Sequence, residues 1–306
     1  MALTVVGSIA FDSVRTPFGE RDRMLGGSAV HFALAARFFT EARIVGPVGD
    51  DFDEEYLELL IERGIDVSDV ERVEGGKTFL WAGHYEADMN LAHTDDTQLG
   101  VFADFDPKLS EASRSADVLF LGNIQPDLQR RVRAQANGSR LTALDSMNLW
   151  IETTRDSLVA AISEVDCLLF NDSEIRMLTE EPNLARAARA VMDMGPRFVV
   201  AKRGEYGAVL FTPEGFFALP AFLLEDVRDP TGAGDSFAGG FLGYLDSHGT
   251  GSPSDEILRQ AMAYGTVLAS YNVEEFGTER VARLTEDEVS ERYDALRAMT
   301  HFELSD

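Results

Sequence analysis

The feature that most constrains the fold is a regular alternation of short β-rich runs with amphipathic helical runs. Residues 3–9 (LTVVGSI) are typical of a buried strand, and residues 28–39 carry apolar side chains at helical spacing. The same order returns with a strand over 42–49 and a helix over 51–64. This alternation predicts an α/β protein whose sheet is mainly parallel and has helices on both faces.

The alternation continues to the end of the chain. Further strands are expected where short apolar runs precede polar or turn residues: 116–123, 140–146, 165–171 and 196–202. The last helices are expected over 235–248, 254–272 and 285–299.

One region departs from this order. Residues 77–90 and 96–102 are typical of strands, and no helical run lies between them. Together with residues 13–25 they predict a small accessory sheet. Such a sheet could act as a lid that excludes water from a reacting centre.

The charge of the chain limits its partners. Asp and Glu number 53 against 27 Lys and Arg, which gives a formal net charge of −26. Such a surface repels nucleic-acid phosphates, and no basic run offsets it. The acidity favours adaptation to a salt-rich cytoplasm. The scarcity of lysine, with only Lys77, Lys108 and Lys202, is also explained by a GC-rich genome.

Composition and length favour a folded cytoplasmic protein. Of the 306 residues, 45% are hydrophobic, enough for one large core or two smaller ones. No apolar stretch has the length of a membrane helix. The first residues lack the basic segment of a secretory signal. Cys167 is the single cysteine, so an internal disulfide is excluded.

The most informative segment is DPTGAGDSFAGGFLGYL, residues 229–245. A loop with small residues leads into a helix at about Asp235, so the backbone can approach a ligand closely. The free N–H groups and positive dipole of a helix start attract an anion. Asp235 stands at the same place and could take a proton from an attacking hydroxyl. The combination is what phosphoryl transfer to an alcohol requires.

Other interpretations of this segment are weaker. Asp235 could only cap a helix, and the glycines could only form a turn. A dinucleotide-binding fingerprint would require glycine at Phe237 and would normally follow the first strand. A Walker-type phosphate loop requires Gly-Lys-Ser/Thr, which the sequence lacks.

The segment DPTGAGDSFAGGF resembles the C-terminal signature of the ribokinase-like (PfkB) family of sugar and nucleoside kinases. Other family motifs are matched in order by GSIAFD, LGGSAVHFALA, FNDSE and AKRGEYGAVLF. The resemblance covers essentially the whole chain. It implies a single three-layer α/β/α kinase domain over 1–306, with a small β-sheet lid formed by about 13–25 and 77–102.

The resemblance also implies ATP, Mg²⁺ and a set of residue roles. Asp235 would be the general base, and the backbone of Gly232, Ala233 and Gly234 would form the anion hole. The residues expected to bind the nucleotide are Asn171, Glu174, Lys202, Gly204, Thr231, Ala263 and Ser270, with Glu174 also binding Mg²⁺ through water. Those expected at the phosphate acceptor are Asp12, Gly26, Gly27, His31 and Asn123. A monovalent cation (K⁺) near the Asp229 loop is left open.

Each role has a plainer alternative. Glu174 could be an acidic residue that only pairs with a helix dipole. Lys202 could be a solvated strand end, and Asp12 could cap a turn. His84 and His93 are expected to be surface residues of the lid.

Departures from the family pattern concern the phosphate acceptor. His31 stands where sugar-specific members commonly carry Asn, and residues 145–150 lack the Arg of an Asp-x-Asn-x-Arg run. No cationic cluster that could hold a sugar phosphate is visible. A neutral polyol is therefore expected, with a sugar as the leading acceptor and a ribonucleoside or cyclitol as alternatives.

A nucleoside would need an apolar slot, which Trp81, Phe11 or Phe102 could supply. A non-catalytic sensor of sugar or nucleotide is the remote alternative. A homodimer through the lid sheet is also expected to be possible, because such a sheet has edges to cover.

Overall fold

The computed structural model describes residues 2–249 and 251–301. Its larger sheet has nine strands in the order β13-β12-β11-β10-β9-β8-β1-β4-β5. All neighbours pair in parallel except β11 with β12 and β12 with β13. The strands are β1 (Ala2–Val6), β4 (Glu41–Gly49), β5 (Asp66–Val73), β8 (Val118–Leu121), β9 (Leu141–Leu144), β10 (Cys167–Asn171), β11 (Phe198–Lys202), β12 (Ala208–Thr212) and β13 (Gly215–Leu219). The predicted mainly parallel sheet is confirmed.

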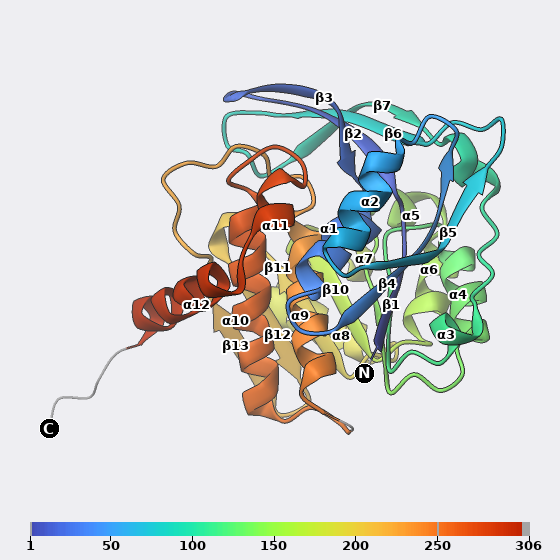
Figure 1. Ribbon diagram of the computed structural model, residues 1–306. Coiled ribbons are helices and arrows are strands. Elements are labelled where there is room, and N and C mark those ends of the chain that lie inside the picture. Colours follow the sequence, from blue (N-terminus) through green and yellow to red (C-terminus); the bar gives the residue numbers. More distant parts are fainter. Residues whose placement is uncertain (1, 250, 302–306) are drawn as a thin grey trace, which may run out of the picture.

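Helices cover both faces of this sheet (Figure 1). Successive residues of a strand point to opposite faces, so Val118 and Phe120 of β8 join one hydrophobic cluster and Leu119 and Leu121 join the other. Helices that contribute to the first cluster are α1 (Ser28–Ala36), α2 (Glu54–Glu62), α9 (Ala233–Ser247), α10 (Asp255–Asn272), α11 (Glu279–Arg283) and α12 (Glu286–Thr300). Helices that contribute to the second are α4 (Pro126–Gln135), α5 (Asn148–Thr153), α6 (Arg155–Ile162), α7 (Asp172–Thr179) and α8 (Leu184–Met192). The short helix α3 (Glu111–Arg114) precedes β8. The architecture is the three-layer α/β/α fold expected.

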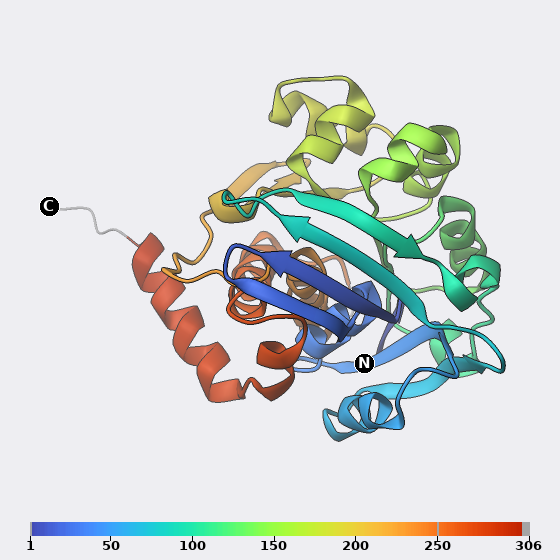
Figure 2. The same cartoon turned by 90° about the horizontal axis from the view of Figure 1, so that it is seen from above.

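A second sheet of four strands has the order β3-β2-β6-β7. Its strands are β2 (Ala10–Thr16), β3 (Gly19–Gly26), β6 (Phe79–Tyr85) and β7 (Ala92–Gln98). Figures 1 and 2 show it lying across the end of the larger sheet where β1 leaves towards β2. The predicted small sheet is thus confirmed. Strands β2 and β3 overlap the predicted segment 13–25, and β6 and β7 lie within 77–102.

Several element boundaries differ from the prediction: for example, β6 ends at Tyr85 rather than at residue 90, and β7 begins at Ala92 rather than at residue 96. The strand expected over 96–102 ends at Gln98, and a 3₁₀ helix, η1 (Gly100–Asp104), follows it. Gly100 has a φ of +52°, which an extended strand cannot contain. Helix α9 begins at Ala233, two residues before Asp235, because Gly232 adopts the left-handed conformation that starts it. No helix in the described part of the chain has the length and apolar character needed to span a membrane.

Candidate active site

A cavity of about 2240 Å³ lies between the two sheets, where the parallel strands of the larger sheet end. Open α/β sheets characteristically place ligand sites at these carboxyl ends. Most of the predicted site residues line this one cavity: Asp12, Gly27, His31, Asn123, Asn171, Glu174, Lys202, Gly204, Thr231, Gly232, Ala233, Gly234, Asp235 and Ser270. The structure therefore brings together residues from distant parts of the chain.

Gly26 and Ala263 are not among the residues that line the cavity. A Cβ on Gly26 would lie 1.9 Å from Oδ2 of Asp12. Gly26 therefore does not line the cavity itself, but its lack of a side chain leaves room for the Asp12 carboxylate. Ala263 packs against the hydrophobic core instead. On α10 the lining residues are Thr266, Ala269 and Ser270, with Val273 just beyond the helix.

The loop before α9 is held by a buried carboxylate. Oδ1 of Asp229 accepts a hydrogen bond from the N–H of Thr231 at 2.9 Å, and Oδ2 accepts one from Gly277 at 2.9 Å. The N–H of Ala233 donates to the carbonyl of Pro230 at 3.1 Å. An anion hole at this turn would therefore rest on the amides of Gly232 and Gly234.

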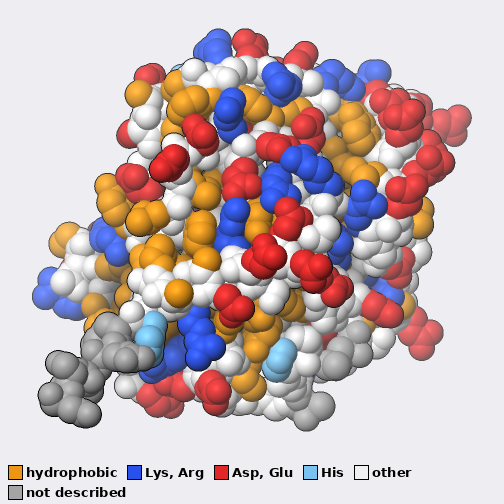
Figure 3. All heavy atoms as spheres, turned by 60° about the vertical axis from the view of Figure 1, so that its left-hand side comes forward, with side chains coloured by type: hydrophobic (Ala, Val, Ile, Leu, Met, Phe, Trp, Pro, Cys, Tyr) orange, Lys and Arg blue, Asp and Glu red, His pale blue; other side chains and the backbone are white. Residues whose placement is uncertain are grey.

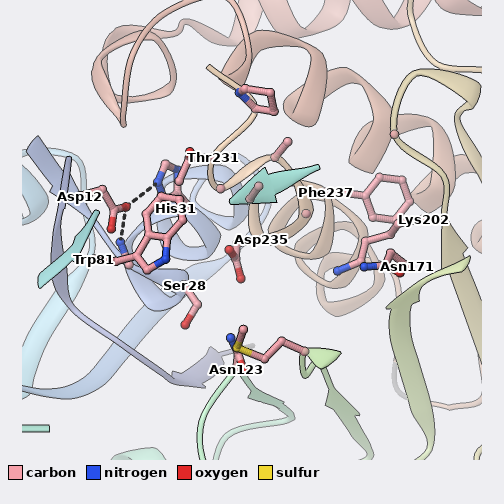
Figure 4. Close-up of a pocket in the computed structure, with 18 of the residues that line it drawn as sticks. Asp12, Ser28, His31, Trp81, Asn123, Asn171, Lys202, Thr231, Asp235 and Phe237 are labelled. Atoms are coloured by element: carbon pink, nitrogen blue, oxygen red, sulfur yellow. Dashed lines mark hydrogen bonds and ion pairs between the residues drawn. The ribbon is translucent and has the colours of Figure 1, made fainter. Parts of the chain in front are cut away.

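Asp235 lies at the centre of the cavity. Figure 4 shows its carboxylate between Asp12 and His31 on one side and Lys202 and Asn171 on the other. Burial raises the pKa of Asp235 to about 7, and the negative charge of Asp145 adds to this effect, whereas Lys202 opposes it. A carboxylate with such a pKa is suited to accept a proton near neutral pH.

Lys202 forms an ion pair with Asp145. Its Nζ also lies beside the start of α9, because a Cβ on Gly234 would be only 3.1 Å from it. Burial disfavours the charge on Lys202, but the carboxylates of Asp145 and Glu174 outweigh it and raise its pKa. The structure thus places a charged ammonium next to the proposed anion hole rather than on a solvated strand end.

Asp145 is a site residue that was not predicted from the sequence. The sequence did contain an indication of this role: Asp145 directly follows the buried strand β9, at the carboxyl edge of the sheet. Its partner Lys202 ends the strand β11, two places along the sheet. Only the strand order reveals that these two charges meet.

Asn171 and Glu174 form a capping box at the start of α7. The Asn171 side chain accepts from the N–H of Glu174, and Oε2 of Glu174 accepts from the N–H of Asn171, both at 2.8 Å. Burial, with a contribution from Asp145, raises the pKa of Glu174 to about 8. Glu174 therefore caps the start of α7, and the same side chain also faces the cavity.

The residues present fit a magnesium ion held largely by waters and phosphates. Glu174 is a buried carboxylate with one oxygen committed to the capping box, which leaves the other for a cation or its waters. In the described part of the chain no three His, Cys, Asp or Glu side chains cluster as a metal site. Mg²⁺ typically uses few protein ligands together with substrate phosphates.

Asp12 and Asn123, which the sequence predicts to contact the phosphate acceptor, both line the cavity. Oδ2 of Asp12 accepts from the N–H of Gly27 at 3.3 Å, and burial raises its pKa to about 7. Oδ1 of Asn123 accepts from the indole N–H of Trp150 at 2.9 Å. An indole can only donate, so the Asn123 amide nitrogen is turned away from Trp150. Trp150 was noted in the sequence only as a departure from a motif.

Aromatic side chains also line the cavity. Trp81 and Tyr85 lie four residues apart on β6, a spacing that points side chains to one face of a strand, and both line the cavity. The hydroxyl of Tyr85 lies 3.2 Å from the Thr231 hydroxyl and joins the small sheet to the loop before α9. Further apolar or aromatic lining comes from Phe79, Leu99, Phe102, Met147 and Trp150.

A three-layer α/β fold with a glycine-rich turn, a helix start and a buried carboxylate at one cavity fits phosphoryl transfer to an alcohol. Comparison with known proteins agrees: the sequence model of the pfkB family carbohydrate kinases matches residues 8–283. The chain belongs to this family and is a phosphotransferase of the PfkB type.

Three curated relatives are kinases of small molecules. A cytidine kinase of Thermococcus kodakarensis is 30% identical over 84% of this chain and 92% of its own. An ATP-dependent ribose-1-phosphate kinase of Halopiger xanaduensis is 29% identical over 71% and 72%. A nucleoside kinase of Methanothermobacter thermautotrophicus is 27% identical over 90% and 91%.

Solved structures share the fold. A nucleoside kinase of Burkholderia thailandensis in complex with inosine superposes with a TM-score of 0.79 at 20% identity, over 96% of this chain and 97% of that one. A putative ribokinase II from E. coli in complex with ATP and Mg²⁺ gives a TM-score of 0.78 at 16% identity, over 97% and 99%.

Proposed function

We propose that this ATP-dependent kinase of the ribokinase family phosphorylates a hydroxyl of a ribonucleoside. The observation that carries the proposal is the aromatic lining of the cavity that also holds Asp12 and His31; this lining includes Trp81, Phe102 and Trp150. A free sugar needs a polar partner for each buried hydroxyl, whereas a nucleobase needs an apolar slot with a few polar groups. Two of the relatives reported above, a cytidine kinase and a nucleoside kinase, support this choice.

A free sugar, the leading expectation from the sequence, is the second candidate. A sugar phosphate is disfavoured by the charges of the site. The cations that line the cavity are Arg131, Lys202 and Arg203. Of these, Lys202 lies beside the start of α9 and is assigned to the transferring phosphate, and Arg203 directly precedes Gly204, where the nucleotide is expected. Arg131 pairs with Asp106 at 2.8 Å.

In the proposed mechanism the acceptor hydroxyl lies against Asp235, which takes its proton as the oxygen attacks the γ-phosphorus of ATP. The bond from the γ-phosphorus to the oxygen that bridges to the β-phosphate breaks, and ADP leaves. The amides of Gly232 and Gly234 and the Lys202 ammonium stabilise the negative charge on the transferring group. Bound Mg²⁺, near Glu174 and Asn171, would supply further positive charge to the phosphates. The small sheet covers the acceptor and excludes water.

The test is consumption of Mg-ATP against a panel of ribonucleosides, free sugars, cyclitols and ribose 1-phosphate. One or more ribonucleosides should be the best acceptors. If a free sugar or sugar phosphate is the best acceptor and ribonucleosides are not used, the nucleoside assignment is wrong.

The assignment of the base is tested in the same assay. Asp235→Asn should lower kcat by about two to four orders of magnitude and leave ATP binding intact, because only proton removal is lost. Asp156→Asn, an exposed change on α6, is the matched control and should keep full turnover. Full turnover by Asp235→Asn would refute the role of Asp235.

A further inference from the structure

The segment between β13 and α9 forms one wall of the cavity. It contains no helix or strand over residues 220–232, and Figures 1 and 2 show it as a long loop on the same side of the molecule as α12. Within the described part of the chain, no backbone–backbone hydrogen bond holds residues 221–227; the first come at Arg228 and Asp229, whose N–H groups donate to the carbonyl of Val273. The residues of this loop that line the cavity before Arg228 are Ala221, Phe222, Leu223, Leu224, Glu225 and Val227.

Helix α10 lines the same cavity with Thr266, Ala269 and Ser270. The hydroxyl of Thr266 donates to the carbonyl of Met262 at 2.9 Å, and the hydroxyl of Ser270 donates to that of Val267 at 2.7 Å. Because both protons are used within the helix, these side chains present mainly apolar surface to the cavity. The loop and α10 thus give this part of the cavity the apolar walls that a flat aromatic ring needs.

This part of the cavity adjoins the turn proposed as the anion hole. A Cβ on Gly265 of α10 would lie 2.8 Å from the carbonyl of Phe237, so α10 packs closely on the first turns of α9. Phe237 itself also lines the cavity. A nucleotide whose phosphates lie at Gly232 and Gly234 can therefore place its base against α10.

Arg292 of α12 contacts both walls, although it does not line the cavity itself. Its guanidinium carbon lies 5.0 Å from the centre of the Phe222 ring, and its Nη1 donates to the Ser270 hydroxyl oxygen at 3.2 Å. The guanidinium is held in place by the ring of Tyr271, with the guanidinium carbon 3.3 Å from its centre, and by an ion pair of Nη2 with Glu274 at 2.6 Å. The fixed guanidinium therefore links the loop to α10.

The chemistry of this link suits arginine. A guanidinium is planar and always charged, so it can stack on aromatic rings while its N–H groups donate in its plane. Residues 221–227 lack backbone hydrogen bonds of their own, so side-chain packing must hold Phe222 in place. That packing comes from the hydrophobic core and from Arg292.

We propose that Arg292 is a positioning residue for the phosphate donor: it holds Phe222 and Ser270 at the separation that receives the base of ATP. The proposal rests on the proposed function only in taking ATP as the donor, and it does not depend on the identity of the acceptor. The base of ATP is remote from the phosphate that is transferred. Loss of Arg292 should therefore weaken nucleotide binding and leave the chemical step unchanged.

Arg280 offers a matched control, because it shares the surroundings of Arg292 without its contacts to the two walls. Its guanidinium carbon lies 4.6 Å from the centre of the Tyr271 ring, and its Nε pairs with Glu274 at 2.9 Å. The two arginine side chains are also similarly buried, with 14% and 15% exposed. A role confined to stability would affect both arginines alike.

The first test measures the KM for Mg-ATP in turnover and the Kd for Mg-ADP by calorimetry. Arg292→Met should raise both at least about fivefold, the lower end of what stacking on a base contributes. It should leave kcat and the KM for the acceptor within about twofold of wild type. Arg292→Lys keeps the charge but not the planar group, so it is the milder variant and should change nucleotide binding in the same direction.

Arg280→Met should bind Mg-ADP like wild type, even where thermal melts show that it loses as much stability as Arg292→Met. Equal losses of Mg-ADP binding in the two Met variants would overturn the proposal. So would wild-type binding of Mg-ADP by both Arg292→Met and Arg292→Lys.

The second test is a double-mutant cycle that asks whether Arg292 acts through Phe222. Phe222→Ala alone should weaken Mg-ADP binding, and adding Arg292→Met should then weaken it by a smaller factor than in the wild-type background, because their contact is already lost. Full additivity would overturn the proposal. Calorimetry with Mg-ADP needs no acceptor. If no ribonucleoside is phosphorylated while Arg292→Met alone weakens Mg-ADP binding, the nucleoside assignment fails and the role of Arg292 stands.

Discussion

At the scale of single residues, the site is governed by carboxylates that the fold takes out of water. Asp12 and Asp235 each have a pKa raised to about 7, mainly by burial, and Glu174 has one raised to about 8. Lys202 is the cation placed among them, and it pairs with Asp145. Groups with such shifted pKa values commonly mark sites of proton transfer.

These pKa values predict how activity depends on pH. Asp235 must be ionised to accept a proton, and Asp12 must be ionised to accept a hydrogen bond. As pH falls through about 7 both become protonated, so kcat/KM should fall at least tenfold per pH unit below that point. The measurement is a pH–rate profile between pH 5 and 9. A rate that stays flat down to pH 5 would contradict both roles.

The same shift predicts that Asp235 lowers the stability of the fold. Its pKa is higher in the folded state than the ordinary 3.8, so the folded state binds a proton more readily than the unfolded state. Stability should therefore be lost as pH rises towards 7. Asp235→Asn should melt at a higher temperature than wild type at pH 8, and the two should converge near pH 4. A lower melting temperature for the variant at pH 8 would show that the charge is well compensated.

At the scale of elements, the close packing of α1 against α9 builds the site. A Cβ on Gly239 of α9 would lie 2.2 Å from the carbonyl of Phe32 in α1, so the glycine lets the two helices approach. This contact brings His31 of α1 against Gly232 at the start of α9. The position of His31 and the conformation of the loop before α9 therefore depend on each other.

Because of this packing, two glycines with similar backbone conformations should respond differently to substitution. Gly232 has a φ of +75° and Gly64 a φ of +76°, but a Cβ on Gly64 would have nothing within 4 Å. Gly64→Ala should cost only the strain of the left-handed backbone, about 1–2 kcal/mol, and keep activity. Gly232→Ala should also displace His31 and abolish turnover. Thermal melts and initial rates of the two variants measure this, and comparable rates would refute the role of the turn.

At the scale of the whole molecule, the surface carries a large excess of carboxylates. Figure 3 shows acidic side chains spread over one face, with basic ones among them. Many arginines form ion pairs, such as Arg280 with Glu274 and Glu288. The 53 acidic residues still exceed the 27 basic ones, so the folded protein repels itself.

We expect salt to relieve this repulsion. Screening is stronger in molar KCl than in dilute buffer, so the melting temperature should rise with KCl concentration. NaCl at the same ionic strength is the control, because screening alone does not distinguish the two salts. Equal melting temperatures in dilute buffer and in molar KCl would refute the salt adaptation. An effect of KCl alone at low concentration would point to the K⁺ site left open near Asp229.

The predicted homodimer through the small sheet stays a prediction. Strands β3 and β7 are the edges of that sheet, and most of their residues are exposed. Exposed edges can pair with a second chain.

The sequence by itself determined the fold class and the family, and most of the site residues it predicted line the cavity. Hydrophobic periodicity predicts the strands and helices, and the segment 229–245 carries the turn and Asp235, because both signals are local. Tertiary structure alone decided the pairing of Lys202 with Asp145, the contact of His31 with Gly232, and the separation of Ala263 from the cavity. These depend on strand order and helix packing, which join residues far apart in the chain, so no local pattern contains them.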